Sequence, residues 1–395
     1  MAKIDDSVKK KVPELRFKGF TDEWEQRKLS NESTITAGGD VDKSKLKEVG
    51  EYPIFANALT NDGTVGYYDS YYRVEAPAVT VTGRGDVGHA KARKVNFTPV
   101  VRLLAVKSNH DVDFLENAIN NHKVLVESTG VPQLTAPQLG NYKIFFPTGE
   151  EEQKIGSFFK QLDKTIALHQ HKLDLLKEQK KGYLQKMFPK NGAKVPELRF
   201  AGFADDWEER KLKDVTERVR SNDGRLDLPT LTMSASSGWL DQKDRFSGDI
   251  SGKEKKNYTL LKKGELSYNH GNSKLAKYGV VFSLTNYEEA LVPRVYHSFK
   301  ALENTSADFI EYMFSTKLPD RELGKLVSSG ARMDGLLNIN YDDFMNIHIS
   351  IPNYEEQILM SAFFRKLDEN IALHQRKLDL LKEQKKGFLQ TMFAK

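Results

Sequence analysis

The stretch Gly83-Arg-Gly-Asp-Val-Gly88 is the first place where residue types and spacing suggest chemistry, because it matches the glycine pattern of a dinucleotide-binding loop. Such a loop also needs a helix that opens at its last glycine and an acidic residue about 20 positions further on. Here the chain continues from His89 to Phe97 with the alternation of a strand and with several basic residues. We therefore favour a glycine-rich connection between strands, which lets Arg84 approach a partner, over a nucleotide site.

Side chains that can contact DNA gather around this loop and again in the second half of the chain. Arginine reads guanine edges through two hydrogen bonds, lysine holds phosphates, and amides read base edges. The predicted DNA contacts of the first half are Tyr67, Tyr68, Arg84, Gly85, His89, Lys91, Arg93, Lys94 and Gln133. Those of the second half are Arg218, Arg220, Lys255, Lys256, Tyr268, Asn269, His270, Asn272, Lys274, Arg332 and Asn338. Each one alone is also compatible with a solvated surface position, but their clustering in both halves favours nucleic acid.

The sequence offers no catalytic or metal site of its own. It has no cysteine, no Walker A pattern, no Pro-Pro dipeptide of the kind found in the signature of amino-methyltransferases, and no His-Glu-x-x-His motif. Its nine histidines are scattered. We predict that the chain is not an enzyme and binds no cofactor by itself.

Two pairs of near-identical segments show that the chain is a tandem duplication. Ile166–Gly182 recurs 205 positions later as Ile371–Gly387, with one substitution. Val12–Trp24 recurs 183 positions later as Val195–Trp207. We call the elements that begin with these copies, Val12–Leu29 and Val195–Leu212, the frame segments. Their large apolar side chains, such as Trp24, are expected to pack onto a core. Frames that are retained around two unlike inserts predict two domains of one plan with different binding surfaces.

The longer repeat predicts a helix over residues 151–188 and a second one at the end of the chain. Apolar residues from Ile155 to Met187 alternate in steps of four and three, which is the a/d seam of a coiled coil. The helix would be roughly 55 Å long. The second copy has the same seam from Leu359 to Met392, so we expect the two helices to pair with each other, antiparallel. The alternative is two amphipathic helices that each lie on their own domain.

Polar and apolar residues on these helices have separate expected roles. His169, Lys180, His374 and Lys385 interrupt the seam and are expected to fix its register. The seam leaves over a second set of apolar positions, which predicts docking of a partner: Leu168, Leu175, Leu184, Leu373, Leu380 and Leu389.

Changes of composition and helix-breaking residues divide the chain into five predicted parts. Residues 1–30 are a tail and the first frame segment, 31–147 the first insert, 148–213 a long helix, a linker and the second frame segment, 214–352 the second insert, and 353–395 the final helix. Strands are expected within Ala78–Thr82, Val100–Val106, Tyr142–Pro147, Leu228–Met233, Tyr278–Leu284 and Ile347–Ile351, and short helices over residues 113–127 and Asp308–Ser315. The fold class is therefore α+β, with two mixed α/β domains, a pair of long antiparallel helices and pseudo-twofold repetition.

Length and charge add broad limits. The 395 residues can form two or three domains. A net charge of +5 permits nucleic-acid binding without demonstrating it. No apolar run approaches the roughly 20 residues that a membrane span needs. The lack of cysteine and of an apolar core at the N-terminus leads us to expect a cytoplasmic protein with no membrane partner.

The combination of motifs resembles the specificity subunit of type I restriction–modification systems. The resemblance covers nearly the whole chain and is carried by the frame segments, by Tyr52–Asn57, by Gly83–Gly88, by the Glu-Glu-Gln runs at Glu151 and Glu355, and by the repeated Lys-Leu-Asp-Leu-Leu-Lys-Glu-Gln-Lys-Lys-Gly. It implies two target recognition domains, each of which reads one half of an asymmetric bipartite site in double-stranded DNA. It also implies that the helices dock two modification subunits.

The same resemblance places the chemistry in other subunits. The modification subunits would bind S-adenosylmethionine and methylate adenine N6 after flipping the base. Restriction subunits with ATP- and Mg²⁺-dependent motors would complete the nuclease. The alternative from another class is a coiled-coil interaction scaffold without DNA specificity of its own.

Overall fold

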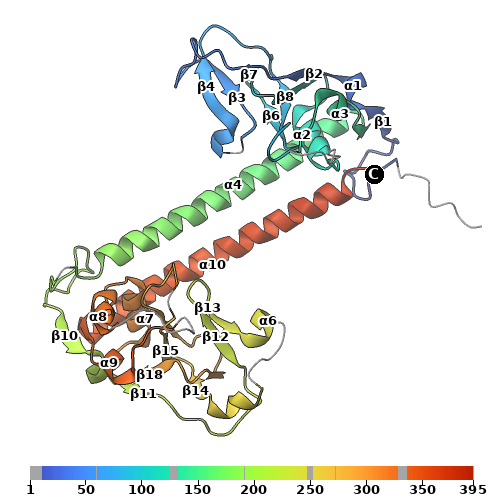
Figure 1. Cartoon of the computed structure of the whole chain (residues 1–395). Helices are drawn as coiled ribbons and strands as arrows, with labels where there is room; N and C mark the ends of the chain where they lie inside the picture. Colours follow the sequence, from blue (N-terminus) through green and yellow to red (C-terminus); the bar gives the residue numbers. More distant parts are fainter. Residues whose placement is uncertain are drawn as a thin grey trace, which may run out of the picture. The chain divides into compact units, whose positions relative to one another are not determined.

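The computed structural model describes residues 11–58, 60–124, 132–190, 192–246, 252–271, 273–327 and 336–394. The chain divides into two units. Unit 1 comprises Met1–His171 and His374–Lys395, and unit 2 comprises Lys172–Leu373. Each unit therefore holds one insert together with a stretch of each long helix (Figure 1).

Unit 1 is built around a four-stranded antiparallel sheet in the order β2-β8-β5-β6. Its strands are β2 (Ser33–Ala37), β5 (Ala78–Val81), β6 (Ala90–Arg93) and β8 (Leu104–Ser108). A three-stranded sheet, in the order β4-β3-β7, contains β3 (Tyr52–Phe55), β4 (Thr64–Tyr68) and β7 (Thr98–Pro99). The short helical elements are α1 (Leu29–Glu32), η1 (Thr60–Gly63), α2 (Val112–Asn120) and α3 (Ala136–Gly140). Buried side chains of the four-stranded sheet and α2 share one apolar core.

Unit 2 repeats the central sheet in the corresponding order, β11-β18-β15-β16. These strands are β11 (Thr216–Arg218), β15 (Leu266–Asn269), β16 (Val280–Ser283) and β18 (His297–Ala301). Two antiparallel pairs accompany it: the hairpin of β12 (Leu231–Ser234) with β13 (Gly238–Asp241), and β14 (Thr259–Lys262) with β17 (Glu289–Val292), which are not consecutive in the chain. The helical elements are α5 (Leu212–Val215), α6 (Gln242–Phe246), η2 (Gly252–Asn257), α7 (Ala307–Ser315), α8 (Asp320–Leu326) and α9 (Tyr341–Met345). The common plan predicted for the two inserts is confirmed, with different hairpins around a shared sheet.

Two predicted elements have other bounds than expected. The run from Val100 to Val106 begins as a turn, because Val101 and Arg102 adopt positive φ of 50° and 63°, and the strand starts only at Leu104. The helix expected up to residue 127 is α2, which ends at Asn120. The segment that follows it, residues 125–131, lies outside the described residues.

The frame segments close each domain onto its helix. In unit 1, β1 (Glu25–Lys28) pairs antiparallel with β9 (Lys143–Phe146), and in unit 2, β10 (Glu208–Lys211) pairs in the same way with β19 (His348–Ile351). Trp24 and Trp207, just before β1 and β10, are buried as expected. The insert therefore leaves and re-enters the frame at a single two-stranded ladder, so its surface can differ while the frame stays the same.

A buried ion pair fastens each frame segment to the start of a long helix. In unit 1, Arg16 makes two hydrogen bonds of 2.7 Å to the carboxylate of Glu151, which also accepts the indole N–H of Trp24 at 3.2 Å. In unit 2, Arg199 makes the same pair of 2.7 Å bonds to Glu356. Both carboxylates are fully buried. Paired charges of this kind explain why the arginine of the frame and the glutamates of the helix recur together.

His110 lies between two carboxylates in unit 1. Its Nδ1 is 2.7 Å from Glu152 Oε1, and its Nε2 is 3.1 Å from Glu32 Oε2. Burial opposes a charge on the ring, but the hydrogen bonds to Glu152 and Glu32 outweigh this effect and raise the pKa of His110. In unit 2 the place of Glu152 is taken by Gln357, whose Oε1 accepts the N–H of Ser306 at 3.0 Å. The titrating cluster therefore belongs to unit 1.

Unit 1 is expected to lose this stabilisation as the pH rises. A raised pKa in the folded state means that the contribution is complete below the unfolded value of about 6.5 and is lost as the pH passes the higher folded value. The hydrogen bond from His110 lowers the pKa of Glu32, so the contribution of Glu32 is lost only as the pH falls. Urea unfolding of the wild type and of His110→Gln, at about pH 6 and about pH 9, should show a stability difference that shrinks at the higher pH. A difference that grows with pH would contradict the assignment.

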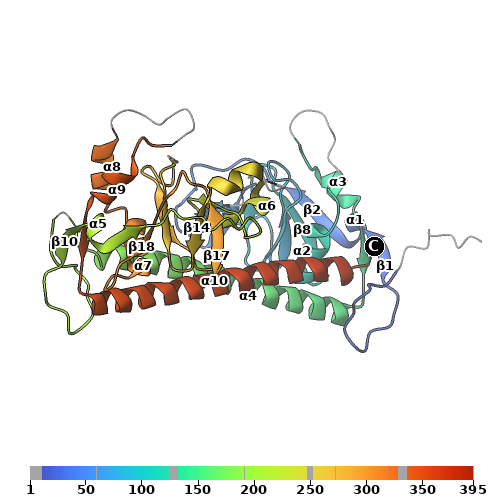
Figure 2. The same cartoon turned by 90° about the horizontal axis from the view of Figure 1, so that it is seen from below.

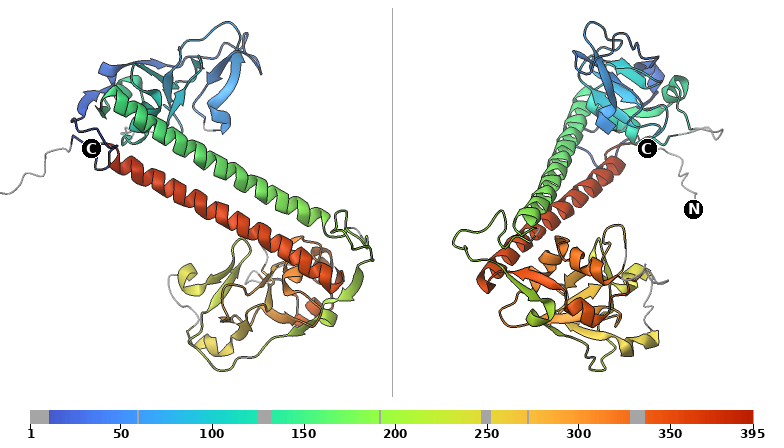
Figure 3. Two further views of the ribbon diagram at one scale, coloured as in Figure 1. Left: turned by 180° about the vertical axis from the view of Figure 1, so that it is seen from behind. Right: turned by 60° about the vertical axis from the view of Figure 1, so that its left-hand side comes forward.

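The two long helices are α4 (Gly149–Lys186) and α10 (Tyr354–Thr391), with 38 residues each. At 1.5 Å per residue each is about 57 Å long. In each unit a stretch of α4 runs beside a stretch of α10 (Figure 2). Figure 3 shows the same stretches of α4 (green) and α10 (red) from two further directions. At the C-terminal end of α10, the N–H of Leu15 in the first frame segment donates to the carbonyl of Thr391 at 2.9 Å. The predicted long helices are confirmed.

The polar residues of the seam meet one another, and their order shows that the helices are antiparallel. In unit 1, Lys385 Nζ lies 2.6 Å from Asp163, and the Nδ1 atoms of His169 and His374 lie 3.1 Å apart. In unit 2, Lys180 Nζ lies 2.5 Å from Asp368. At the 205-residue shift, Asp163 corresponds to Asp368 and Lys180 corresponds to Lys385. The two ion pairs are therefore formed by the same aspartate and lysine of the repeat. A seam slipped by one turn would leave these groups without partners, which is how they specify the register.

One predicted seam position is wrong. Leu359 is 47% exposed, whereas Met360 next to it is 2% exposed. The reason is that the first turns of α10 pack against the core of the unit 2 domain, where Met360 and Phe364 lie with Phe309 of α7. The first turns of α10 therefore direct their apolar side chains towards that domain, and only later turns direct them towards α4.

The Lys385–Asp163 pair should contribute modestly, because both groups are partly solvated. A double-mutant cycle with Lys385→Gln and Asp163→Asn is expected to give a coupling free energy of about 0.5–1 kcal/mol. Urea unfolding at low and high salt is the measurement, with the coupling smaller at high salt. A coupling of zero at low salt would show that the pair sets the register without adding stability.

Candidate nucleic-acid interface

The Gly83–Gly88 loop connects β5 to β6 and no helix follows it, so the dinucleotide interpretation is excluded. The loop is held at its base: the N–H of Gly88 donates to the carbonyl of Thr82 at 2.8 Å, and the N–H of Leu134 to that of Gly83 at 2.9 Å. Gly88 has a φ of +87°, and a Cβ there would lie 2.4 Å from a methyl group of Val124. The result is a rigid turn that leaves Arg84 and Gly85 exposed.

Three basic residues predicted here as DNA contacts are held by acidic neighbours. Arg93 is buried, its Nη1 lies 2.7 Å from Asp62, and its guanidinium lies 3.8 Å from the ring centroid of Phe55. The prediction for Arg93 is therefore corrected, since this side chain is part of the interior. Lys91 also pairs with Asp62, and Lys94 pairs with Asp113, although both remain exposed. In the described part of the chain, Arg84 makes no such ion pair.

The aromatic and amide candidates of unit 1 divide in the same way. Tyr68 is buried and its hydroxyl accepts the N–H of Asp42 at 2.9 Å, so it is corrected from a DNA contact to a core residue. Tyr67 is half-buried, and its main chain pairs with that of Lys47. Gln133 is half-buried and pairs through its backbone with Arg84. His89 is exposed on the approach to β6.

In unit 2 the predicted cluster around Tyr268 is mostly interior. Tyr268 is fully buried, stacks on Phe344 with centroids 4.2 Å apart, and donates its hydroxyl to the carbonyl of Tyr278 at 2.7 Å. His270 is also buried. Asn269 is half-buried, and its Oδ1 accepts the N–H of Gly271 at 3.0 Å. The predictions for Tyr268 and His270 are corrected, because β15 is a central strand covered on both faces and both side chains lie in the interior.

The remaining candidates of unit 2 lie at the surface or outside the described part. Lys256, Lys274 and Asn338 are exposed, and Lys255 is half-buried with its Nζ 3.5 Å from the carbonyl of Leu226. Asn272 and Arg332 lie outside the described residues.

Arg218 and Arg220 are exposed on and beyond β11. Arg294 is missing from the residues predicted from sequence, because it stands between Pro293 and Val295 with no basic neighbour beside it. The pKa of Arg220 is lowered by the charge of Arg218 and then by that of Arg294, so both act on Arg220. Only the pairing of β11 with β18 brings them together.

Four of the six leucines predicted to dock a partner are exposed on α4 and α10. The exposed fraction is 66% for Leu168 and 57% for Leu373, and Leu175 and Leu380 are also exposed. Leu184 and Leu389 are corrected, because they pack against the cores of unit 2 and unit 1.

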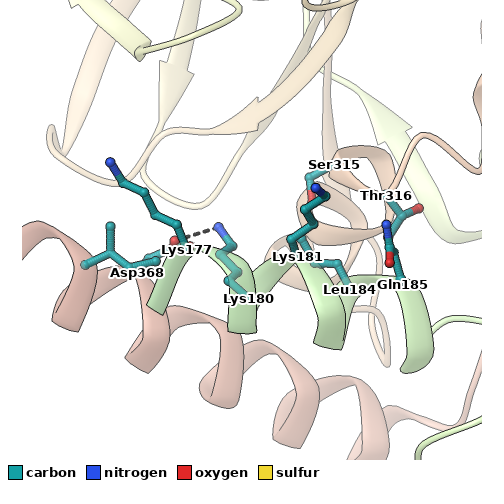
Figure 4. Close-up of a pocket in the computed structure, with 9 residues that line it drawn as sticks. Lys177, Lys180, Lys181, Leu184, Gln185, Ser315, Thr316 and Asp368 are labelled. Carbon is teal, nitrogen blue, oxygen red and sulfur yellow. Dashed lines mark hydrogen bonds and ion pairs between the residues drawn. The ribbon is translucent and has the colours of Figure 1, made fainter. Parts of the chain in front are cut away.

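A lysine-rich groove of about 500 Å³ lies between the end of α4 and the end of α7 in unit 2 (Figure 4). Lys180 is held there by Asp368, which also accepts the hydroxyl of Tyr312 at 2.9 Å. The hydroxyls of Ser315 and Thr316 donate to carbonyls of α7. These polar groups therefore already have hydrogen-bond partners within the protein. The groove does not place a nucleophile beside a base.

Among the described residues, no group of three or more histidine or acidic side chains is arranged to hold a metal ion. Within the same ranges, every helix is too short or too polar to span a membrane.

A family model of the type I restriction modification DNA specificity domain matches residues 21–178 and again residues 204–383. The chain belongs to this family. One match falls on each repeat, and each includes a frame strand, an insert and most of a long helix. The specificity domains of this chain are thus the two duplicated halves that the sequence predicted.

Relatives of the specificity family agree with this assignment. Two Mycoplasma pneumoniae proteins, provisionally named type I specificity subunits, are 27% and 30% identical over 163 and 165 residues, which are 39% and 38% of this chain. The matched part spans about half of their length, 45% and 49%. A specificity subunit of the type I restriction enzyme MjaVIII from Methanocaldococcus jannaschii is 21% identical over 287 residues, 69% of this chain and 66% of that protein.

A solved structure supports the fold. The crystal structure of a type I restriction–modification S subunit from M. genitalium matches with a TM-score of 0.64 and 12% identity, over 97% of this chain and 99% of that one. At this identity the match supports the fold alone.

Proposed function

We propose that this chain is the non-catalytic, DNA-reading subunit of a type I restriction–modification complex. Each unit would read one half of an asymmetric bipartite site in double-stranded DNA. One observation carries the proposal. The two units share the strand order of the central sheet and the two-stranded ladder of the frame, β1 with β9 or β10 with β19, but differ in the hairpins and exposed polar residues around them. A target with two different half-sites requires two domains of the same architecture whose DNA-facing surfaces differ.

The proposed contacts are the exposed candidates on rigid supports. In unit 1, Arg84 is the best placed to read a base, because its loop is pinned on both sides and its guanidinium has no carboxylate partner in the described part of the chain. A bidentate contact to guanine is worth about 1–3 kcal/mol of discrimination. In unit 2, Lys256, Lys274 and Asn338 are exposed.

The chemistry would come from other subunits. The exposed leucines of α4 and α10 support docking of two modification subunits, which would bind S-adenosylmethionine and methylate adenine N6. Restriction subunits that use ATP and Mg²⁺ would join for cleavage. These partners and cofactors are proposed from the family assignment.

Mapping adenine methylation in cells with and without this chain tests the proposal. The expected result is one new N6-methyladenine motif in two separated halves. With Arg84→Ala, one base position of one half should become less stringent while the other half stays unchanged. The same helices also suit an interaction scaffold without DNA specificity, and a stable complex that adds no methylation motif would favour that alternative.

A further inference from the structure

The edge strand β11 carries arginines on one side only. It pairs antiparallel with β18, with Arg218 opposite Phe299, and the N–H of Val219 continues the ladder to the carbonyl of Ser298 at 3.0 Å. The carbonyl of Ser221 then accepts the N–H of Leu260 at 2.8 Å, so the backbone is held on both sides of Arg220. Val219 packs against a buried apolar cluster. Because side chains alternate along an extended chain, Arg218 and Arg220 lie on the face opposite that cluster, and both are exposed.

Arg294 joins them from the turn that precedes the neighbouring strand β18. In this turn the N–H of Tyr296 donates to the carbonyl of Pro293 at 3.0 Å. Because Arg218 is opposite Phe299 and Val219 continues the ladder to Ser298, the chain after β11 runs towards this turn and brings Arg220 to it. The strand register carries this placement, and it agrees with the pKa of Arg220, which repulsion from Arg218 and then from Arg294 lowers.

Among the described residues, none of the three arginines makes an ion pair with a carboxylate, although Glu217 and Asp342 line the same hollow as Arg218. Glu217, next to Arg218, is engaged by Lys300 at 3.1 Å. Arg218 instead stacks on Tyr341, with its guanidinium carbon 4.0 Å from the ring centroid. Burial raises the pKa of Tyr341 to about 12, so this ring is neutral at physiological pH. By contrast, Arg210 and Arg225 of the same unit are paired with Glu208 and Asp223.

We propose that Arg218, Arg220 and Arg294 form a site for phosphate groups of the DNA backbone and thereby position unit 2 on its half-site. Three like charges held together at a surface are unfavourable without an anion. A planar guanidinium is well suited to phosphate oxygens, and the backbone of a duplex offers a row of them. This inference rests on the proposed function and assigns these residues to positioning, not to sequence reading.

The test is the salt dependence of DNA binding by the full chain. Anisotropy titrations of a duplex of arbitrary sequence, over a range of NaCl concentrations, compare the wild type with Arg294→Gln and Arg220→Gln. Each removed phosphate contact should lower the slope of log K against log salt by about 0.9. Binding should weaken equally on duplexes of different sequence. Arg210→Gln, which removes an exposed arginine that already has a carboxylate partner, should leave the slope unchanged.

Lysine substitution separates the two ways in which an arginine contacts DNA. Arg294→Lys should restore most of the slope, because a phosphate accepts a point charge, whereas a bidentate base contact would stay lost. The methylated motif should be the same for all variants. A slope equal to that of Arg210→Gln, or a motif that changes at one base, would overturn the phosphate site. If the wild type binds no duplex at all, the proposed function itself fails, independently of these arginines.

Discussion

Replacing Arg199 with methionine is expected to destabilise unit 2 by about 3–5 kcal/mol, because the buried carboxylate of Glu356 would keep its charge but lose its partner. Glu356 is only 1% exposed and receives two hydrogen bonds of 2.7 Å from Arg199. Hydrogen exchange read by peptide is the measurement, because it reports on each unit separately. Exchange should accelerate in β10 and β19, while β1 and β9 serve as the internal control.

A second variant decides whether the buried charge is the cause. Arg199→Met combined with Glu356→Leu removes both charges, and apolar replacement of a buried pair is often neutral or stabilising. The double variant should therefore be more stable than the single one. Arg210→Gln, in which the lost partner Glu208 is exposed, is the matched control and should show no local change. A single variant no worse than the double would refute the explanation.

Replacing Leu168 and Leu373 with aspartate is expected to weaken capture of modification subunits by roughly 100-fold, since two central apolar contacts of an interface commonly contribute at least 1–2 kcal/mol each. These two leucines correspond at the 205-residue shift and are the most exposed of the six. The chain itself should stay folded, because neither side chain belongs to a buried cluster. Quantitative pull-down with titrated partner is the measurement, and circular dichroism checks the helices.

The matched control uses the same helices and the same change of charge. Gln179→Asp with Gln384→Asp places new carboxylates at exposed positions that also correspond at the 205-residue shift. Binding by this control should remain near the wild-type value. Equal loss in both double variants would indicate that charge alone, and not an apolar contact, governs docking.

The frame explains how one scaffold can support different recognition surfaces. Each insert begins and ends at a two-stranded ladder, β1 with β9 or β10 with β19. The buried pair Arg16–Glu151 or Arg199–Glu356 fastens the same ladder to the helix. Changes in the hairpins of an insert therefore need not disturb the frame.

The sequence alone determined the duplication, the long helices and the two-domain plan. These properties depend on residues close in the chain or repeated along it, such as Ile166–Gly182 and its copy, and the seam of fours and threes predicts the helical pair directly. The family assignment rests on the same repeated motifs. Polar residues such as His169 and Lys180 could be recognised as register devices because they interrupt an otherwise apolar pattern.

Only the tertiary structure decided which polar residues face solvent. Arg93, Tyr68 and Tyr268 have the residue types of a DNA contact, but strand pairing places each of them in the interior, against partners that lie far away in the sequence. Arg294 has no basic neighbour in the sequence and joins Arg218 and Arg220 only because β18 pairs with β11. The physical reason is that burial and charge clustering depend on contacts between strands, which local pattern does not encode.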